Sequence, residues 1–156
     1  MEDFVAICKE RTTEALESFL RVLRFVPADK LTWSPTPTAK SALQIVAHCA
    51  GYSGNFAAII STRKFPPVDE FRGAVKAAIA SVTTLEEAEA MLRKGIADTI
   101  VALDTVKPEE VRGMIDAPQG PTPFMFFLTL PAGHLETHES QIDYLQTCWD
   151  DQEVHI

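Results

Sequence analysis

The chain has 156 residues, of which 46% are hydrophobic and 23% are charged. This length and composition predict one globular domain, residues 1–156. The net charge of −8 argues against binding to nucleic acid or to an anionic membrane surface. The most apolar run, PFMFFLTLPAG, is about half as long as a membrane-spanning helix.

The N-terminal segment and the cysteines point to the cytoplasm. The segment MEDFVAICKE has acidic residues where a signal peptide needs basic ones. The chain has three cysteines and no C-x-x-C motif, which suits a reducing compartment better than a disulfide scaffold. We therefore expect a cytoplasmic protein with free thiols.

The first two helices follow from apolar spacing and proline. A helix is predicted from Glu2 to Val26, because apolar residues recur every three or four positions until Pro27. The segment PADKLTWSPTPTAK carries three prolines and is predicted as a loop. A second helix is expected from Ser41 to Ser61. Residues 70–82 fit either a short helix or an irregular crossover.

The second half of the chain predicts two more long helices. One starts at a capping box formed by Thr84 and Glu87, in which each side chain binds the other residue's free backbone N–H. Pro108 and the stretch DAPQGPTP predict a loop after it. The last helix is expected from about residue 122 to 149, with a kink or a late start at Pro131. Four long amphipathic helices predict an all-α four-helix bundle, with a long connection between helices two and three.

Three of the four histidines fall on faces that are predicted to point inward. At 100° per residue, His134 and His138 lie on the apolar stripe of the last helix, whereas its acidic residues Glu139 and Asp143 point toward solvent. His48 lies on an inward stripe of the second helix. The fourth, His155, is expected to be exposed or disordered near the C-terminus.

A buried imidazole must be hydrogen-bonded or bound to a metal, because its desolvation is otherwise not compensated. The i, i+4 spacing of His134 and His138 places both rings on one face, and His48 could complete a three-histidine site. Such a site leaves a coordination position open for water or substrate. For the His134 and His138 pair, two hydrogen-bonded core histidines are the alternative.

Four polar residues lie on the same faces and could orient the histidines or contact a substrate. These candidates are Gln44, Tyr52, Asn55 and Gln141. The alternative for each is an ordinary polar residue on a helix flank. The chain has no H-E-x-x-H motif and no G-x-S-x-G motif, which argues against a metalloprotease and a serine hydrolase.

At these positions the chain resembles the DinB/YfiT-like superfamily. The segment LTWSPTPTAKSALQIVAH is similar to the family's stretch from a loop into helix two, and THESQIDYL is similar to its common motif on helix four. The resemblance implies a four-helix bundle whose metal ligands are His48, His134 and His138. The sequence departs from the common pattern at Thr137, and again at residues 139 and 140.

The resemblance also implies a function. It indicates a metal-dependent enzyme that activates a thiol or water for S-transfer or hydrolysis of a small molecule. The implied cofactors are a divalent transition metal, zinc or nickel, and a low-molecular-weight thiol. A homodimer is implied as well. The alternative is a non-catalytic, metal-stabilised bundle that acts through dimerisation or ligand binding, with Phe124, Phe126 and Phe127 as interface candidates.

Overall fold

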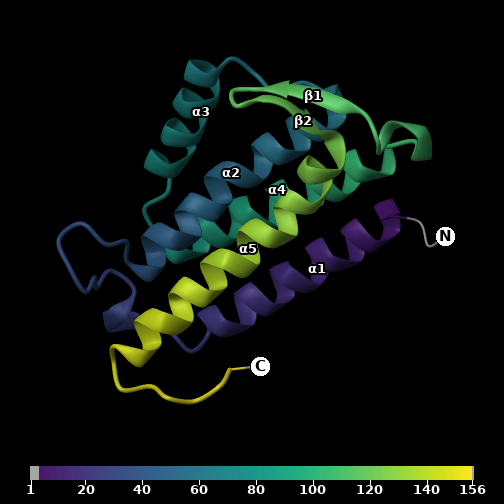
Figure 1. The fold of residues 1–156 in the computed structure, drawn as a ribbon. Helices are drawn as coiled ribbons and strands as arrows, with labels where there is room; N and C mark the ends of the chain where they lie inside the picture. Colours follow the sequence, from purple (N-terminus) through teal and green to yellow (C-terminus); the bar gives the residue numbers. More distant parts are fainter. Residues whose placement is uncertain (1–3, 156) are drawn as a thin grey trace.

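Four long helices lie side by side in the computed structural model, which describes residues 4–155 (Figure 1). They are α1 (Phe4–Leu23), α2 (Ala42–Thr62), α4 (Leu85–Asp104) and α5 (Phe124–Thr147). A shorter helix, α3 (Val68–Ala80), lies in the connection between α2 and α4 and packs against α2. The all-α bundle with a long connection between its second and third long helices is therefore confirmed.

The helix boundaries follow the local signals in the sequence. Ser41 caps α2, and Thr84 and Glu87 form the predicted capping box of α4. Helix α1 ends at Leu23 rather than at Val26, because residues 24–26 continue as tighter turns with bonds to carbonyls three positions back. The predicted start of this helix at Glu2 lies outside the described residues.

A β-hairpin replaces the loop that was predicted around DAPQGPTP. Strand β1 (Met114–Ala117) pairs antiparallel with β2 (Gly120–Pro123), and Ile115 lies opposite Thr122. Gly120 has a φ of 107°, which L side chains rarely adopt, so glycine is favoured at this turn. The loop prediction is wrong here because two prolines obscure the strand pattern and only Ile115 of the hairpin is buried.

Helix α5 carries two of the three candidate histidines and passes through Pro131 without a break. It begins at Phe124, so the expected late start at Pro131 is wrong. Its buried face includes Phe127, Leu128 and Ile142, which pack into the core. The position of α5 beside α1 and α2 brings the middle of the helix next to His48.

Helices α2 and α4 pack closely against each other. Gly95 of α4 lies against Ser53 of α2, and the hydroxyl of Thr99 donates to the backbone carbonyl of Ser53 at 3.2 Å. The cores on both sides of this contact are built from aliphatic and aromatic side chains. None of the helices within residues 4–155 is long and apolar enough to cross a membrane.

Candidate metal centre

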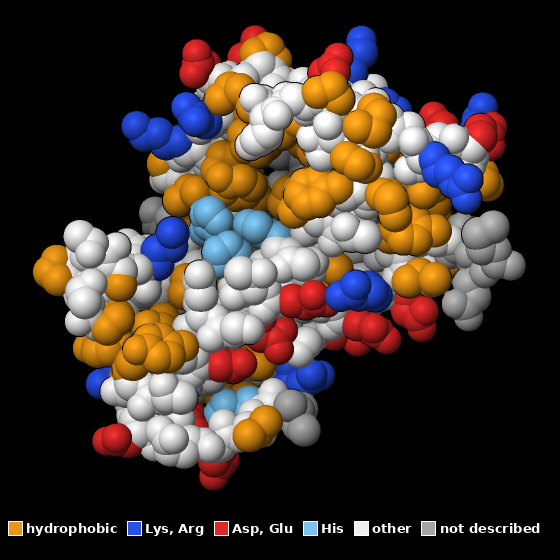
Figure 2. Space-filling view, viewed as in Figure 1, with side chains coloured by type: hydrophobic (Ala, Val, Ile, Leu, Met, Phe, Trp, Pro, Cys, Tyr) orange, Lys and Arg blue, Asp and Glu red, His pale blue; other side chains and the backbone are white. Residues whose placement is uncertain are grey.

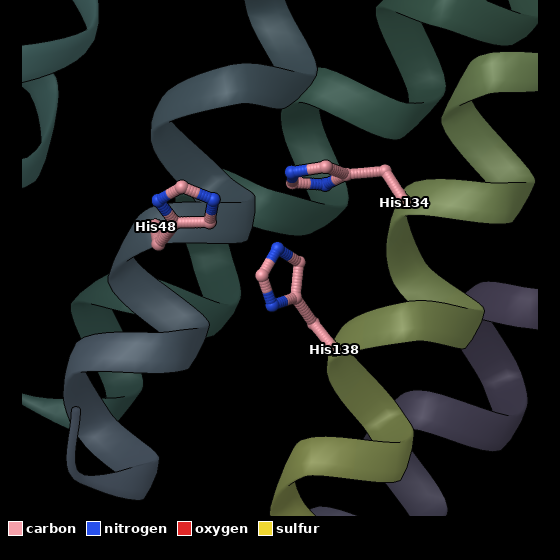
Figure 3. Close-up of side chains that lie close together, drawn as sticks. All are labelled: His48, His134 and His138. Carbon is pink, nitrogen blue, oxygen red and sulfur yellow. The ribbon is translucent and has the colours of Figure 1, made fainter. Parts of the chain in front are cut away.

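Three histidine rings converge from two helices (Figure 3). His48 projects from α2, and His134 and His138 project from successive turns of α5. The ring centroids of His134 and His138 are 4.5 Å apart, and that of His48 lies 5.2 Å and 4.6 Å from them. The sequence predicted that these three side chains lie on inward-pointing helix faces, and their convergence agrees with that prediction.

The spacing of the ring nitrogens suits a shared ion. One nitrogen from each ring can be chosen so that all three lie within 4.8 Å of one another. Nitrogens bound to one tetrahedral zinc ion lie about 2.0–2.1 Å from it and hence ~3.4 Å apart. The nitrogens must therefore move closer together to bind one ion. The three histidines could thus hold a metal ion.

Burial keeps two of the rings neutral. Desolvation, followed by the repulsive effect of His138, lowers the pKa of His134 to about 3. Desolvation, followed by the effects of His138 and Lys40, lowers the pKa of His48 to about 4. Metal binding requires the neutral imidazole, so these rings need lose no proton near neutral pH before they bind an ion.

One nitrogen of the cluster is buried without a partner. Nδ1 of His134 has no hydrogen-bond partner among the described residues, although a buried polar nitrogen normally has one. A metal ion bound through Nδ1 would satisfy this atom. The donor set of three neutral imidazoles also fits a divalent transition metal.

Gln141 orients His138. Its side-chain Oε1 lies 2.8 Å from Nδ1 of His138. A carbonyl oxygen can only accept, so Nδ1 donates to it and Nε2 keeps its lone pair. Gln141 thus fixes the tautomer that leaves Nε2 free to bind a metal.

Removal of this hydrogen bond should weaken metal binding. We expect Gln141→Leu to lower the zinc affinity roughly 10-fold, the lower end of the effect of losing an outer-shell partner. Gln141→Glu is the matched control, because a carboxylate oxygen can accept the same hydrogen bond. Competition with a chromogenic chelator measures both affinities. An unchanged affinity in Gln141→Leu would contradict the orienting role.

Acid should destabilise the metal-free protein through the same rings. Their folded-state pKa values of about 3 and 4 lie below the ordinary value of 6.5. Between these values the unfolded chain binds more protons than the folded chain, so stability falls as the pH drops from about 6.5 toward 4. The test is urea unfolding at pH 7 and pH 5 after chelation of any metal. The free energy of unfolding should fall less between these two pH values in His134→Gln than in the parent. Equal losses would rule out this linkage.

The structure places the other candidate residues differently. Tyr52 packs against the cluster, with its ring centroid 4.6 Å from that of His48 and 5.2 Å from that of His134. Gln44 instead completes the capping box of α2, where its Oε1 accepts from the backbone N–H of Ser41 at 2.9 Å. Asn55 donates to the carbonyl of Gly51 at 3.0 Å. Tyr52 and Gln141 are thus the two candidates that contact the histidines.

Two expectations about polar residues outside the cluster are wrong. Glu139 does not simply face solvent, because it is half-buried and accepts a hydrogen bond from Ser18 of α1 at 2.8 Å. The imidazole of His155 stacks on Phe25 with a centroid distance of 3.9 Å and lies 2.9 Å from a carboxylate oxygen of Asp151. Its side chain is only 6% exposed, because the C-terminal segment folds back toward α1.

Two pockets flank the cluster, and neither was predicted from the sequence. A cavity of about 440 Å³, here called the aromatic pocket, is bordered by Tyr52, Phe56, Phe71, Phe127 and His134. A second cavity of about 350 Å³ lies between α2 and α3, where His48 and Tyr52 form one wall. Figure 2 shows a pale blue patch of histidine side chains open at the surface beside hydrophobic ones. Helix α3 and the hairpin, which complete these pockets, were not predicted as defined elements.

Comparison of the sequence with known families identifies the family of this chain. The sequence model of the DinB superfamily matches residues 10–142. Because the match spans most of the chain, the protein belongs to the DinB superfamily. The family assignment made from the helix-two and helix-four motifs is confirmed. No curated protein matches the sequence.

Solved structures show the same fold at low sequence identity. A DinB-like protein from Bacillus subtilis is 14% identical with a TM-score of 0.68, and the match covers 96% of each chain. A conserved protein from Enterococcus faecalis is 17% identical with a TM-score of 0.71, over 94% of this chain and 96% of that one. A mycothiol-dependent maleylpyruvate isomerase is 12% identical with a TM-score of 0.68, over 91% of this chain but only 63% of the isomerase.

Proposed function

We propose that the protein is a metal-dependent enzyme that activates a thiol or water for S-transfer or hydrolysis of a small molecule. One observation carries the proposal: three imidazoles converge from two helices, and the buried Nδ1 of His134 lacks a partner among the described residues. Hydrogen-bonded core histidines, the alternative raised by the sequence, would leave no such atom unsatisfied.

The proposed ligands are His48, His134 and His138, with zinc or nickel as the ion. A bound divalent ion lowers the pKa of a thiol or water and holds the resulting nucleophile. Gln141 keeps Nε2 of His138 available, and the ring of Tyr52 packs against the rings of His48 and His134. Three protein ligands leave a position open for the nucleophile.

The surroundings favour S-transfer over hydrolysis. None of the described residues that line the two flanking pockets is acidic, so no carboxylate is placed there to act as a general base. A thiol needs less help than water, because its ordinary pKa is far lower. The likeness to an isomerase named as mycothiol-dependent supports a low-molecular-weight thiol as co-substrate.

The second candidate is a non-catalytic, metal-stabilised bundle that acts through dimerisation. Met125 and Phe126 at the start of α5 are 44% and 49% exposed and would suit a homodimer interface. Phe124 and Phe127 are buried, so of the three candidate phenylalanines only Phe126 is available for it.

An assay of thiol consumption, with the metal content of the protein measured in the same samples, separates the metal-dependent enzyme from the non-catalytic bundle. Protein loaded with zinc or nickel is assayed with mycothiol, bacillithiol and cysteine, using chlorodinitrobenzene as the electrophile. We expect metal-dependent consumption of at least one thiol that His138→Ala abolishes and His155→Ala retains. Metal that binds and stabilises the protein without any turnover would favour the non-catalytic bundle.

A further inference from the structure

The cavity between α2 and α3 has a distinct chemical character. His48 and Tyr52 form its wall on α2, and Arg72 and Lys76 contribute its charged groups from α3. These two cations are spaced i, i+4, so they lie one turn apart on the same face of α3. None of the described residues that line the cavity is acidic. We call it the anion pocket.

The cations of the anion pocket are free to bind a ligand. Among residues 4–155, neither Arg72 nor Lys76 takes part in an ion pair, although the chain has a net charge of −8. Lys40 adds positive potential near the histidines, since its charge contributes to the lowered pKa of His48. Figure 2 shows basic side chains close to the histidine patch. An overall acidic protein thus presents local positive charge beside its candidate metal centre.

The remaining wall of the pocket restricts the type of anion. Val75 and Ile79 supply apolar surface between the cations and α2. The lining residues on α3 run from Arg72 to Ala80, beyond the first turn of the helix at which phosphate groups usually bind. A single carboxylate on a short apolar stem matches this combination of two cations and an apolar wall.

We propose that the anion pocket binds the carboxylate of a small-molecule ligand beside His48, with Arg72 and Lys76 as the recognising groups. The reaction of that ligand rests on the proposed function, but its recognition does not. The aromatic pocket on the His134 side has no charged lining residue among those described and suits an uncharged, apolar molecule. Tyr52 lines both pockets, so ligands of opposite character would meet at the histidines.

Calorimetric titration tests the anion pocket directly. The probes are phenylbutyrate and its uncharged analogue phenylbutanamide, added to full-length protein whose metal content is measured in the same samples. We expect the parent to bind the carboxylate at least ~10-fold more tightly than the amide, the effect of one or two charged hydrogen bonds. Added salt should weaken binding of the carboxylate and leave that of the amide unchanged.

The variant Arg72→Gln/Lys76→Gln should lose this preference at unchanged metal content. Its control is Arg93→Gln/Lys94→Gln, which removes the same charge from the exposed face of α4 and should keep the preference. Equal affinity for both probes in the parent, no binding of either, or an undiminished preference in the α3 variant would overturn the proposal. A preference that depends on Arg72 and Lys76 in protein that binds no metal would uphold the anion pocket and refute the proposed metal enzyme.

Discussion

Zinc or nickel should raise the melting temperature of the protein, and His138→Ala should abolish the rise. A ligand that binds only the folded state at 100 times its Kd adds about 2.7 kcal/mol to the free energy of unfolding. For a chain of this length that corresponds to ~5–10 °C. His138 is 9% exposed and its ring centroid lies less than 5 Å from those of both other histidines, so its loss removes a ligand and opens the cluster.

The fourth histidine provides the control for this experiment. His155→Ala removes an imidazole that stacks on Phe25 and lies outside the cluster. In the absence of metal, this variant should melt at a lower temperature than the parent. Added metal should raise the melting temperature of the variant by as much as that of the parent. Differential scanning calorimetry with and without a chelator measures both shifts. An equal gain in His138→Ala and in the parent would show that the metal binds elsewhere.

Gly95→Ala should lower the free energy of unfolding by about 3 kcal/mol, the upper end of the cost of overpacking a core. A Cβ atom at this position would lie 1.9 Å from Oγ of Ser53, 2.6 Å from its Cβ and 3.0 Å from the backbone nitrogen of Gly54. The hydroxyl can rotate away, but the other two atoms belong to the α2 backbone or are fixed to it. Helices α2 and α4 must therefore move apart, which also disturbs the hydrogen bond of Thr99.

Gly54→Ala is the matched control for the packing effect. A Cβ atom on Gly54 would meet no atom within 4 Å, and the residue is exposed in the middle of α2. Replacement by alanine should stabilise the helix by roughly 0.5–1 kcal/mol. Urea unfolding of the two variants beside the parent gives the comparison. If Gly95→Ala were as stable as the parent, the close contact between α2 and α4 would be wrong.

The bundle and its histidines could be predicted because local signals determine them. Thr84 and Glu87, which lie close together in the sequence, mark the start of α4. The apolar spacing of α5 sets the direction of His134 and His138. A helix fixes the relative direction of its side chains once its period is known. The meeting of His48 with the other two also required α2 and α5 to be neighbours, which the family resemblance implied.

The missed features depend on contacts between distant residues or on weak patterns. The hairpin buries only Ile115, so its strands show no regular alternation of apolar and polar residues. His155 is buried by Phe25, more than a hundred positions away, and no local pattern could reveal that contact. The cap role of Gln44 was readable, because Ser41 and Gln44 have the spacing of a capping box.

The most direct test of the metal centre is anomalous diffraction at the zinc and nickel edges from crystals of the metal-loaded protein. We expect one strong peak about 2.1 Å from a ring nitrogen of each of His48, His134 and His138. A fourth position should be open to solvent or to an added thiol. Crystals without a peak between the three rings, or with the metal bound at another site, would contradict the account.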